Sequence, residues 1–446
     1  MIKRPETRDR ASATITAMFI RLFPKQTLRR VVAVNTVSQL ITKFVSSGTV
    51  LVISLLLARS AGPDRYGDFV KITTYITFFF LLSDFGMNAF YLQRKDEMVW
   101  WDALVSARVL GGSLLVFLSL MLLTIFPQGV GQGYTRFVRM GIVLFCPAIL
   151  FQSLLTSANG MFQRHLRYDL STIAVTVGCL AALAVTAVSL WGAFSHDVVY
   201  GAIAAMLLGS AVMGIAGMMF ARTLSARSGI SFPWRRMKEL FVCAFPLGIT
   251  LLFNLVYSHA DSVILTLSRT TREVGIYGLS YKVFEWALVL PTFFMNAVYP
   301  PMLRALNHKA GDVSMEFMKL LRNSLRFLLP SSVFLLILLW VGAPLLSFIR
   351  QDFAASTAPL RVLSLGLPFF FASSAVMWAL IALGRPWVLA VLYGVSMAAN
   401  ITANAFYIPR FGYMAAAWIT VLSEGLVLLC SFIVLQKVLQ KSKQGV

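Results

Sequence analysis

Four basic side chains stand inside long apolar stretches of this sequence, where a charge is costly. They are Lys43, Lys71, Arg108 and Lys282. A charged group at the centre of a membrane-spanning helix costs at least about 2.5–3.5 kcal/mol, so such a group usually faces a cavity or a partner. Ammonium and guanidinium groups bind phosphate oxygens well, and lysine does so as a compact point charge. The four cations therefore predict a substrate site for an anionic ligand.

Uncharged polar side chains extend this predicted site along two helices. Asn35, Gln39 and Lys43 follow one another at helical spacing and therefore share a face. Asn254 and Tyr257 follow the same spacing in the second half of the chain. Polar faces inside membrane helices favour contact with a cavity, so we expect these two faces to line one.

The partner of Lys43 is left open by the sequence. Lys43 lies about twelve residues from either end of its predicted helix, which is too far for its ammonium to reach the membrane surface easily. The partner could be an anionic substrate, a carboxylate such as Asp261 or Glu424, or a polar defect in the lipid. Lys71 lies nearer a predicted helix end and could instead extend to the surface.

Carboxylates inside the apolar stretches suggest a second kind of chemistry. Burial favours the protonated form of Asp261, Glu285 or Glu424, so each could exchange a proton or bind sodium and couple transport to an ion gradient. The alternatives are a hydrogen bond between helices for Glu424, and for Glu285 an ion pair with Lys282, which lies one helical turn away. Asp84 could cap a local break in its helix.

The composition identifies the setting of these residues as a membrane. The chain has 446 residues, of which 58% are apolar and 13% charged, and such a chain cannot present an ordinary water-facing surface. A crossing helix needs about 20 apolar residues. Hydropathy and loop residues divide the chain into about twelve such helices. They are predicted at 31–58, 68–92, 103–126, 138–160, 170–192, 198–220, 241–267, 276–302, 327–349, 362–383, 387–408 and 413–436. We therefore expect an all-α polytopic membrane protein.

The basic residues indicate how the chain is oriented. If the first helix runs outward, about 26 of the 39 Lys and Arg residues fall in the tails and inner connections, which places both termini in the cytoplasm. The formal net charge is +21, but these charges are spread over short loops beside helix ends. That arrangement fits contact with anionic membrane lipids rather than with nucleic acid.

An internal repeat divides the chain into two halves. "YGDFVK" at 66–71 recurs as "YGLSYK" at 277–282, and "GAIAA" at 201–205 falls on "GYMAA" at 412–416 at the same offset of 211 positions. Six helices used twice keep the same orientation and form a parallel repeat. We expect an N-lobe at 31–220 and a C-lobe at 241–436, joined by a linker at 221–240. A basic tail precedes them at 1–30, and another follows them at 437–446. Transporters often bind substrate between such repeats.

Several other classes of protein are disfavoured. The four histidines are dispersed, and the four cysteines lack metal-ligand spacing. No phosphate-binding GxxxxGK[ST] loop is present. A membrane glycosyltransferase or polymerase would need catalytic groups on large outward loops, and the predicted outward loops are short. We expect no enzyme activity and no cofactor. The energy would come from a proton or sodium gradient, from the membrane potential or from consumption of the product.

Two stretches resemble a known family. They are "LLLARSAGPDRYGDFVKITTYITFFFLLSDFGMN" at 55–88 and "NLVYSHADSVILTLSRTTREVGIYGLSYKVFEWALVLPTFFMNAVYPPM" at 254–302. Both resemble segments of Wzx-type polysaccharide flippases of the multidrug/oligosaccharidyl-lipid/polysaccharide (MOP) superfamily. Asp261 and Lys282 match positions typical of that family, and Lys43 stands on a helix that lines the cavity there.

The resemblance implies a fold and a function. The fold would be two six-helix lobes in a V, as in the MATE drug exporters, with a central cationic cavity. The function would be ion-coupled movement of an undecaprenyl-diphosphate-linked oligosaccharide across the bacterial cytoplasmic (inner) membrane for polysaccharide biosynthesis. A polysaccharide polymerase and glycosyltransferases of the same pathway would be partners. The main rival is a MATE-type multidrug exporter, which would favour an anionic cavity.

Overall fold

The structure is a computed structural model, which describes residues 28–94, 97–129, 131–190, 197–224, 232–306 and 315–443. These segments are helical apart from turns and two isolated backbone bridges. They contain nine helices or joined helices that are long and apolar enough to cross a membrane, and one bent pair, Gln351–Ser364 with Leu367–Ala382, that could form a tenth crossing. The chain is thus a multi-pass α-helical membrane protein.

Two of these segments are too long for a single crossing. Val34–Leu92 has 59 residues and Trp387–Gln440 has 54, whereas one crossing needs about 20. The first is broken at Gly62 (φ 75°) and the second at Gly412 (φ 63°), each close to a proline. Glycine adopts these positive φ angles without the steric cost that other residues meet. When each broken helix counts as two crossings, the described residues contain the twelve that the sequence predicts.

The helices fall into two groups along the chain. The N-lobe contains α2 (Leu28–Asp84), α3 (Met87–Leu92), α4 (Glu97–Ile125), α5 (Arg136–Phe145), α6 (Ala148–Arg164), α7 (Tyr168–Leu190) and α8 (Val198–Leu224). The C-lobe contains α9 (Trp234–Ser268), α10 (Thr271–Ala287), α11 (Val289–Leu306), α12 (Met315–Gly342), η1 (Ala343–Leu345), α13 (Leu346–Ile349), η2 (Gln351–Ser356), α14 (Thr357–Ser364), α15 (Leu367–Ala382) and α16 (Pro386–Lys443).

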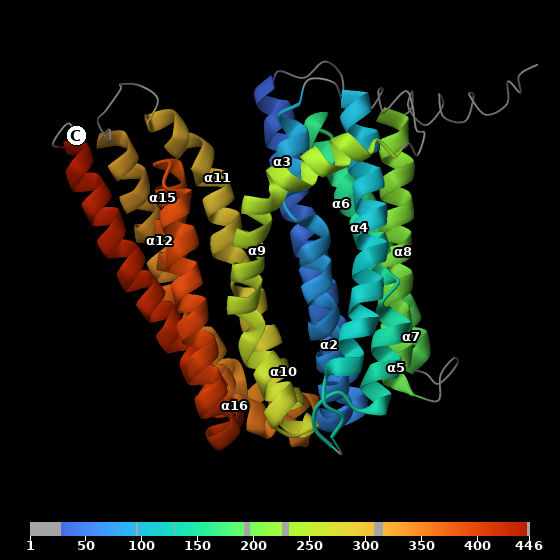
Figure 1. Cartoon of the computed structure of the whole chain (residues 1–446). Coiled ribbons are helices and arrows are strands. Elements are labelled where there is room, and N and C mark those ends of the chain that lie inside the picture. The colour runs from blue at the N-terminus through green and yellow to red at the C-terminus, as the bar shows by residue number, and fades with distance from the viewer. Residues whose placement is uncertain are drawn as a thin grey trace, which may run out of the picture.

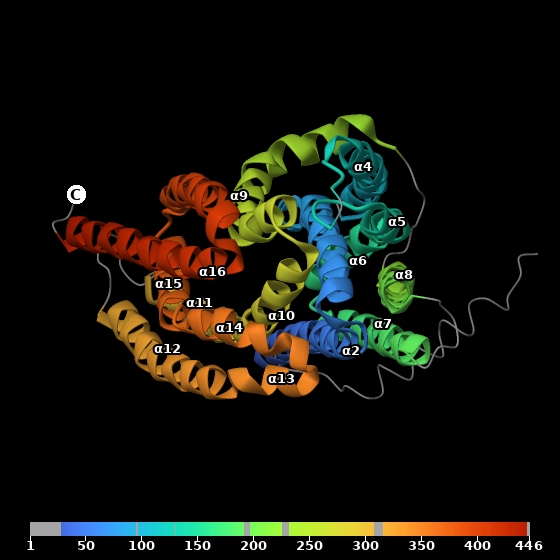
Figure 2. The same ribbon diagram turned by 90° about the horizontal axis from the view of Figure 1, so that it is seen from below.

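The two lobes form a V (Figure 1). They stand apart at the face where α16 ends, which we call the terminal face, and converge at the opposite face, which we call the closed face. The view from below shows α10 and α2 beside each other near the centre of the molecule (Figure 2). The backbones of the two lobes are therefore closest together at the closed face.

The predicted boundaries of the tails and linker differ from the helices. The proposed N-terminal tail lies outside the described residues up to position 27, and the proposed C-terminal tail continues α16 as far as Lys443. In the proposed linker, α8 runs to Leu224 and α9 already begins at Trp234. The first turns of α9 bury Met237 and Leu240 in a cluster with N-lobe residues such as Trp101. Helix α9 thus starts on the N-lobe and ends in the C-lobe.

Glycines in the repeated YGxxxK stretches let the lobes meet closely. A Cβ on Gly67 of α2 would overlap the backbone carbonyl oxygen of Thr271, and one on Gly278 of α10 would lie 2.7 Å from the Val70 side chain. Neither glycine has a positive φ, so close packing explains them better than backbone conformation. The two copies of the repeat face each other across the boundary between the lobes.

Backbone hydrogen bonds also join the lobes at the closed face. The N–H of Gly133, between α4 and α5, donates to the carbonyl of Thr266 at 2.9 Å, and the N–H of Thr271 donates to the carbonyl of Gly131 at 2.9 Å. The α4–α5 connection of the N-lobe therefore binds the end of α9 and the start of α10 in the C-lobe.

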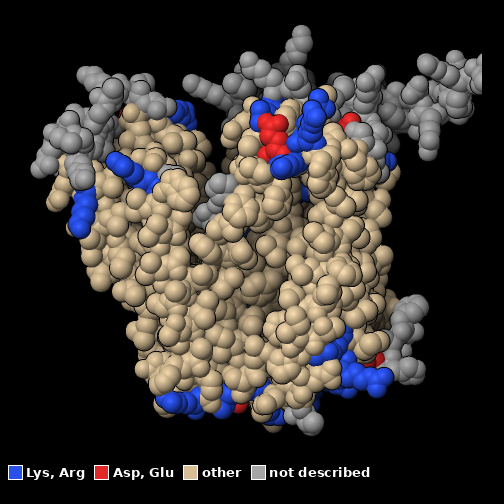
Figure 3. Space-filling view, in the orientation of Figure 1, with Lys and Arg blue, Asp and Glu red and all other residues tan. Residues whose placement is uncertain are grey.

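Charged side chains mark the two ends of the molecule. In the space-filling view, Lys, Arg, Asp and Glu gather at the terminal and closed faces, and a broad band between them is almost free of charge (Figure 3). Large apolar side chains such as Leu114, Phe334 and Leu429 are more than half exposed. Such an apolar surface suits the hydrocarbon core of a bilayer.

Candidate functional site

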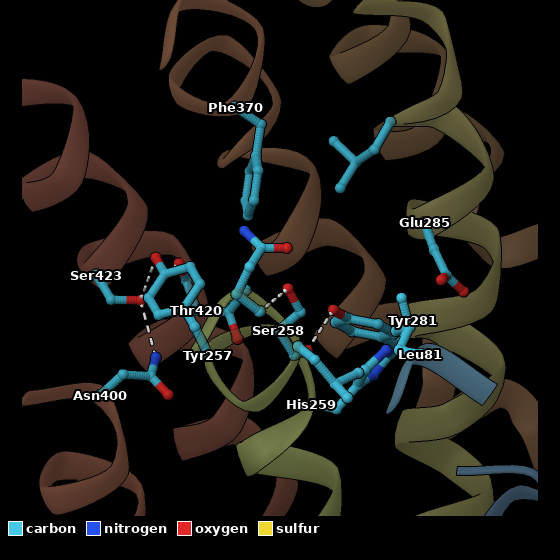
Figure 4. Close-up of a pocket in the computed structure, with 13 residues that line it drawn as sticks. Leu81, Tyr257, Ser258, His259, Tyr281, Glu285, Phe370, Asn400, Thr420 and Ser423 are labelled. Carbon is cyan, nitrogen blue, oxygen red and sulfur yellow. Dashed lines mark hydrogen bonds between the residues drawn. The ribbon is translucent and has the colours of Figure 1, made fainter. Parts of the chain in front are cut away.

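A cavity of about 240 Å³ lies mainly in the wall of the C-lobe that faces the N-lobe. Its lining comes from α9, α10, α15 and α16, with one residue from α2. The lining residues are Leu81, Asn254, Leu255, Tyr257, Ser258, His259, Tyr281, Glu285, Leu288, Phe370, Asn400, Thr420 and Ser423 (Figure 4). The cavity is thus polar and aromatic, and its lining contains neither Lys nor Arg.

Hydrogen bonds hold the polar side chains of this wall in place (Figure 4). The Tyr257 hydroxyl lies 3.4 Å from the Ser423 hydroxyl, and the Asn400 amide donates to the Ser423 hydroxyl at 3.0 Å. Tyr281 donates to the carbonyl of Ser258 at 2.8 Å. Neutral donors and acceptors beside aromatic rings suit a ligand rich in hydroxyl groups.

One ion pair belongs to the cavity. The Lys282 ammonium donates to the Glu285 carboxylate at 2.7 Å, and the two side chains are 33% and 43% exposed. The sequence predicts this pair from the one-turn spacing, and the structure confirms it. The His259 ring lies 6.3 Å from that of Tyr281 and 6.2 Å from that of Phe78 on the N-lobe.

Lys43 approaches this ion pair from the N-lobe. Its side chain is exposed. The ring of the next residue, Phe44, lies 5.9 Å from that of Trp286, which follows Glu285 on α10. The Lys43 ammonium is close enough to Glu285 to interact electrostatically with it. Lys43 and Lys282, which are 239 positions apart in sequence, therefore both act electrostatically on Glu285, and Lys282 is the one that is hydrogen-bonded to it.

Lys71 lies at the lobe boundary and not in the cavity. It is 1% exposed, and its ammonium donates to the Thr271 hydroxyl at 2.7 Å and to the Gly133 carbonyl at 3.0 Å. Its counterpart in the repeat, Lys282, has a carboxylate one turn later, whereas Lys71 has Thr74 there. Contrary to the prediction from the sequence, Lys71 does not line the cavity in this conformation but joins the two lobes.

Arg108 also differs from the prediction of a cavity cation. Its side chain is enclosed, and one terminal nitrogen donates to the Asp84 carboxylate at 3.0 Å, the Asp84 carbonyl at 3.3 Å and the Asn88 amide oxygen at 2.9 Å. Helix α2 ends at Asp84, and Phe85 and Gly86 have φ angles of 42° and 71°. Arg108 therefore satisfies backbone and side-chain oxygens at a helix break, which explains an arginine at this depth.

Two buried carboxylates lie behind the cavity wall. Asp261 accepts hydrogen bonds from the Tyr277 hydroxyl and, at 2.6 Å, from the N–H of Ser262. Glu424 accepts hydrogen bonds from the Ser373 hydroxyl and, at 3.1 Å, from the Tyr257 hydroxyl. Both are 3% exposed. Tyr257 lines the cavity, so it connects Glu424 to the surface that a ligand would contact.

The two polar faces predicted for the cavity have different positions. Asn254 and Tyr257 line the cavity, as predicted. Asn35 is 7% exposed, and its amide oxygen accepts from the N–H of Tyr168 at 2.9 Å, so it belongs to the interior of the N-lobe. Gln39, one turn later, is exposed. Helical spacing in the sequence shows that residues share a face of a helix. It does not show whether that face contacts a neighbouring helix or an open cavity.

Sequence reasoning missed several lining residues. His259, Tyr281, Asn400 and Ser423 were not predicted to lie in the site, although each is a polar group inside an apolar stretch. His259 precedes Asp261 by two positions, and Ser423 adjoins Glu424. Asn400 and Asn404 lie one turn apart on α16 and share a hydrogen bond of 2.8 Å. That spacing is the signal that could have identified α16 as part of the wall.

Two six-helix lobes with a polar cavity between them define a membrane transporter. The chain belongs to the polysaccharide biosynthesis protein family, whose model matches residues 28–306. Comparison with curated protein sequences gives no match. The family and the fold together make the chain a flippase or transporter of the MOP type.

Solved structures share this fold at low sequence identity. The lipid II flippase MurJ in an inward closed conformation is 17% identical, with a TM-score of 0.70 and 90% of each chain covered. A multidrug resistance MATE family transporter of the MOP superfamily, in its inward-facing conformation, is 10% identical, with a TM-score of 0.72 and coverage of 91% of this chain and 99% of that one. An outward-facing structure of a MATE transporter is 11% identical, with a TM-score of 0.65 and coverage of 95% and 98%.

Proposed function

We propose that this protein moves an undecaprenyl-diphosphate-linked oligosaccharide from the inner to the outer leaflet of the bacterial cytoplasmic membrane, for polysaccharide biosynthesis. The observation that carries the proposal is that the cavity residue Glu285 pairs with Lys282 of its own lobe and lies within electrostatic range of Lys43 of the other lobe. A diphosphate needs cations in a site that is otherwise poor in charge. Membership of the polysaccharide biosynthesis family supports this class of substrate.

Each part of the substrate has a suitable surface. The hydroxyl-rich glycan would occupy the cavity, where Asn254, Tyr257 and Asn400 offer hydrogen bonds. The diphosphate would lie between Lys43 and Lys282, and the polyprenyl chain would stay in lipid. With the terminal face in the cytoplasm, as the basic residues indicate, the present conformation would accept substrate from the inner leaflet. Separation of the lobes at the closed face would then release it outward.

The buried carboxylates provide a means of ion coupling. Asp261 and Glu424 are enclosed by neutral hydrogen-bond donors, and neither carboxylate forms an ion pair within the described part of the chain. A carboxylate in such surroundings favours protonation or cation binding over an unpaired charge. We propose that one of them exchanges a proton or sodium ion during the cycle. Glu424 is connected to the cavity through Tyr257.

Native mass spectrometry of the purified protein tests the substrate class. We expect the wild type to retain undecaprenyl diphosphate in preference to the monophosphate, and Lys43→Gln and Lys282→Gln to lose that preference. Lys319→Gln, which removes an exposed charge on α12, is the matched control and should behave as wild type. Equal retention of both lipids by the wild type would contradict the proposal.

A multidrug exporter is the second candidate, because one observation favours it. The cavity lining contains a carboxylate, Glu285, and neither Lys nor Arg, and an anionic, aromatic cavity suits lipophilic cations. Tetraphenylphosphonium is a suitable probe. Tight binding that Glu285→Gln abolishes, together with no preference for the lipid diphosphate, would identify the chain as a drug exporter.

A further inference from the structure

The carboxylate of Glu285 lies at the cavity wall beside Lys282, one of the two lysines to which the proposed function assigns the diphosphate. Glu285 lines the cavity and accepts a hydrogen bond from Lys282 at 2.7 Å. Lys43 of the other lobe is within electrostatic range of the same carboxylate, and the Phe44–Trp286 ring contact of 5.9 Å holds the two helices together beside it. Lys282 therefore already has an anionic partner before any ligand binds, and Lys43 lies within electrostatic range of the same charge.

This ion pair is more accessible to a competing anion than the Arg108–Asp84 pair of the N-lobe. The members of the Lys282–Glu285 pair are 33% and 43% exposed toward solvent, and partly exposed pairs contribute little to stability because water competes for both charges. In the Arg108–Asp84 pair, by contrast, the guanidinium is wholly enclosed at a helix break. A diphosphate carries more charge and more acceptor oxygens than one carboxylate, so it can displace Glu285 from the ammonium groups.

The other acidic groups nearby do not play this part. Asp261 and Glu424 are 3% exposed and accept from hydroxyl or backbone donors. Glu273, on the same helix as Glu285, pairs with Arg269 at the closed face, away from the cavity lining. Among these four carboxylates, Glu285 alone has both access to the cavity and a lysine partner.

We propose that Glu285 is an internal counter-anion, which neutralises Lys282 and Lys43 in the empty cavity and which the diphosphate of the substrate must displace. The inference rests on the proposed function and adds a specificity-determining residue to it. Because Glu285 competes with the ligand, a monophosphate, which carries about 1.5–2 negative charges at pH 7, gains less from the exchange than a diphosphate, whose two phosphoryl groups offer more acceptor oxygens to the two lysines. The cavity would thereby favour the diphosphate over the monophosphate carrier lipid.

Titrations of the purified full chain with farnesyl diphosphate and farnesyl monophosphate test the inference. Glu285→Gln keeps the shape of the side chain but removes its charge. We therefore expect the variant to bind farnesyl diphosphate about fivefold more tightly, and the ratio of its affinities for the two probes to be smaller than in wild type. A fivefold change corresponds to about 1 kcal/mol, which is a typical value for such a pair. Lys282→Gln should weaken diphosphate binding about fivefold or more. Glu273→Gln makes the same charge change on the same helix and should leave binding within about twofold.

The outcomes separate the two proposals. If Glu285→Gln leaves diphosphate binding unchanged or weakens it while Lys282→Gln weakens it, Glu285 merely positions Lys282, and the counter-anion inference is overturned while the flippase proposal stands. If wild type shows no preference for the diphosphate and Lys282→Gln has no effect, both are overturned. Glu285→Asp keeps the charge and is expected to bind no tighter than wild type, which gives a second decisive comparison if the Gln variant proves unstable.

Discussion

Lys71 of the N-lobe donates a hydrogen bond of 2.7 Å to the hydroxyl of Thr271 in the C-lobe, across the boundary where the two lobes meet. The same hydroxyl donates to the carbonyl of Gly131 at 3.1 Å, and the same ammonium donates to the carbonyl of Gly133 at 3.0 Å. One lysine thus connects α2, the α4–α5 segment and the start of α10. These contacts must break if the lobes are to separate at the closed face.

Replacing Thr271 by Val should favour separation of the lobes at the closed face. The change leaves the buried Lys71 ammonium one acceptor short, which costs about 1–3 kcal/mol. We expect amide hydrogen exchange in residues 126–135 to become roughly tenfold faster, because the Gly133 N–H is bonded across the boundary. Thr292→Val, at an exposed hydroxyl bonded within its own helix, is the matched control. Unchanged exchange in the Thr271 variant would mean that Lys71 does not hold the lobes together.

Adding one methyl group to Gly67 should disrupt the same boundary sterically. The new Cβ would overlap the carbonyl of Thr271, and overpacking of this kind costs about 1–3 kcal/mol. We expect Gly67→Ala to lower the thermal unfolding temperature in detergent and to open the closed face in the exchange assay. Gly48→Ala, where a Cβ meets no atom within 4 Å, should be neutral or stabilising. Equal effects of the two substitutions would refute a role for close packing.

Arg108 should matter for stability rather than for ligand binding. Arg108→Gln leaves the Asp84 carboxylate and carbonyl without their guanidinium donor. We expect a loss of about 2–3 kcal/mol, less than for a fully buried pair because the Asp84 side chain is 41% exposed. Thermal unfolding with and without farnesyl diphosphate measures both effects. Normal stability with lost diphosphate binding would return Arg108 to the set of cavity cations.

Glu424 should govern ion coupling without governing substrate affinity. Glu424→Gln keeps an acceptor oxygen for one of the two donors, Ser373 or Tyr257, and cannot take up or lose a proton. In proteoliposomes we expect the stimulation of lipid translocation by an imposed proton or sodium gradient to fall at least about tenfold, while binding of farnesyl diphosphate is retained. Glu316→Gln, at an exposed position on α12, controls for the loss of a carboxylate. Full stimulation of the Glu424 variant would leave Asp261 as the candidate.

The sequence alone determined the features that depend on composition and local spacing. An apolar content of 58% indicates a membrane protein. Because the bilayer has a set thickness, each crossing needs about 20 residues, and this length fixes the number of helices. The Lys282–Glu285 pair is equally local, since three residues on a helix bring two side chains to one face. The Wzx-type resemblance also identified the superfamily, which the family match supports.

Only the tertiary structure decided which intramembrane charges face the cavity. Lys71 and Lys282 occupy equivalent places in the repeat, yet one meets Thr271 and Gly133 across the lobe boundary and the other meets Glu285 on its own helix. Arg108 similarly depends on a helix break at Asp84. Burial of a charge has a cost that depends on which partners surround it, and these partners come from segments distant in sequence. Helical spacing fixes a residue's face, but the packing of other helices fixes what that face meets.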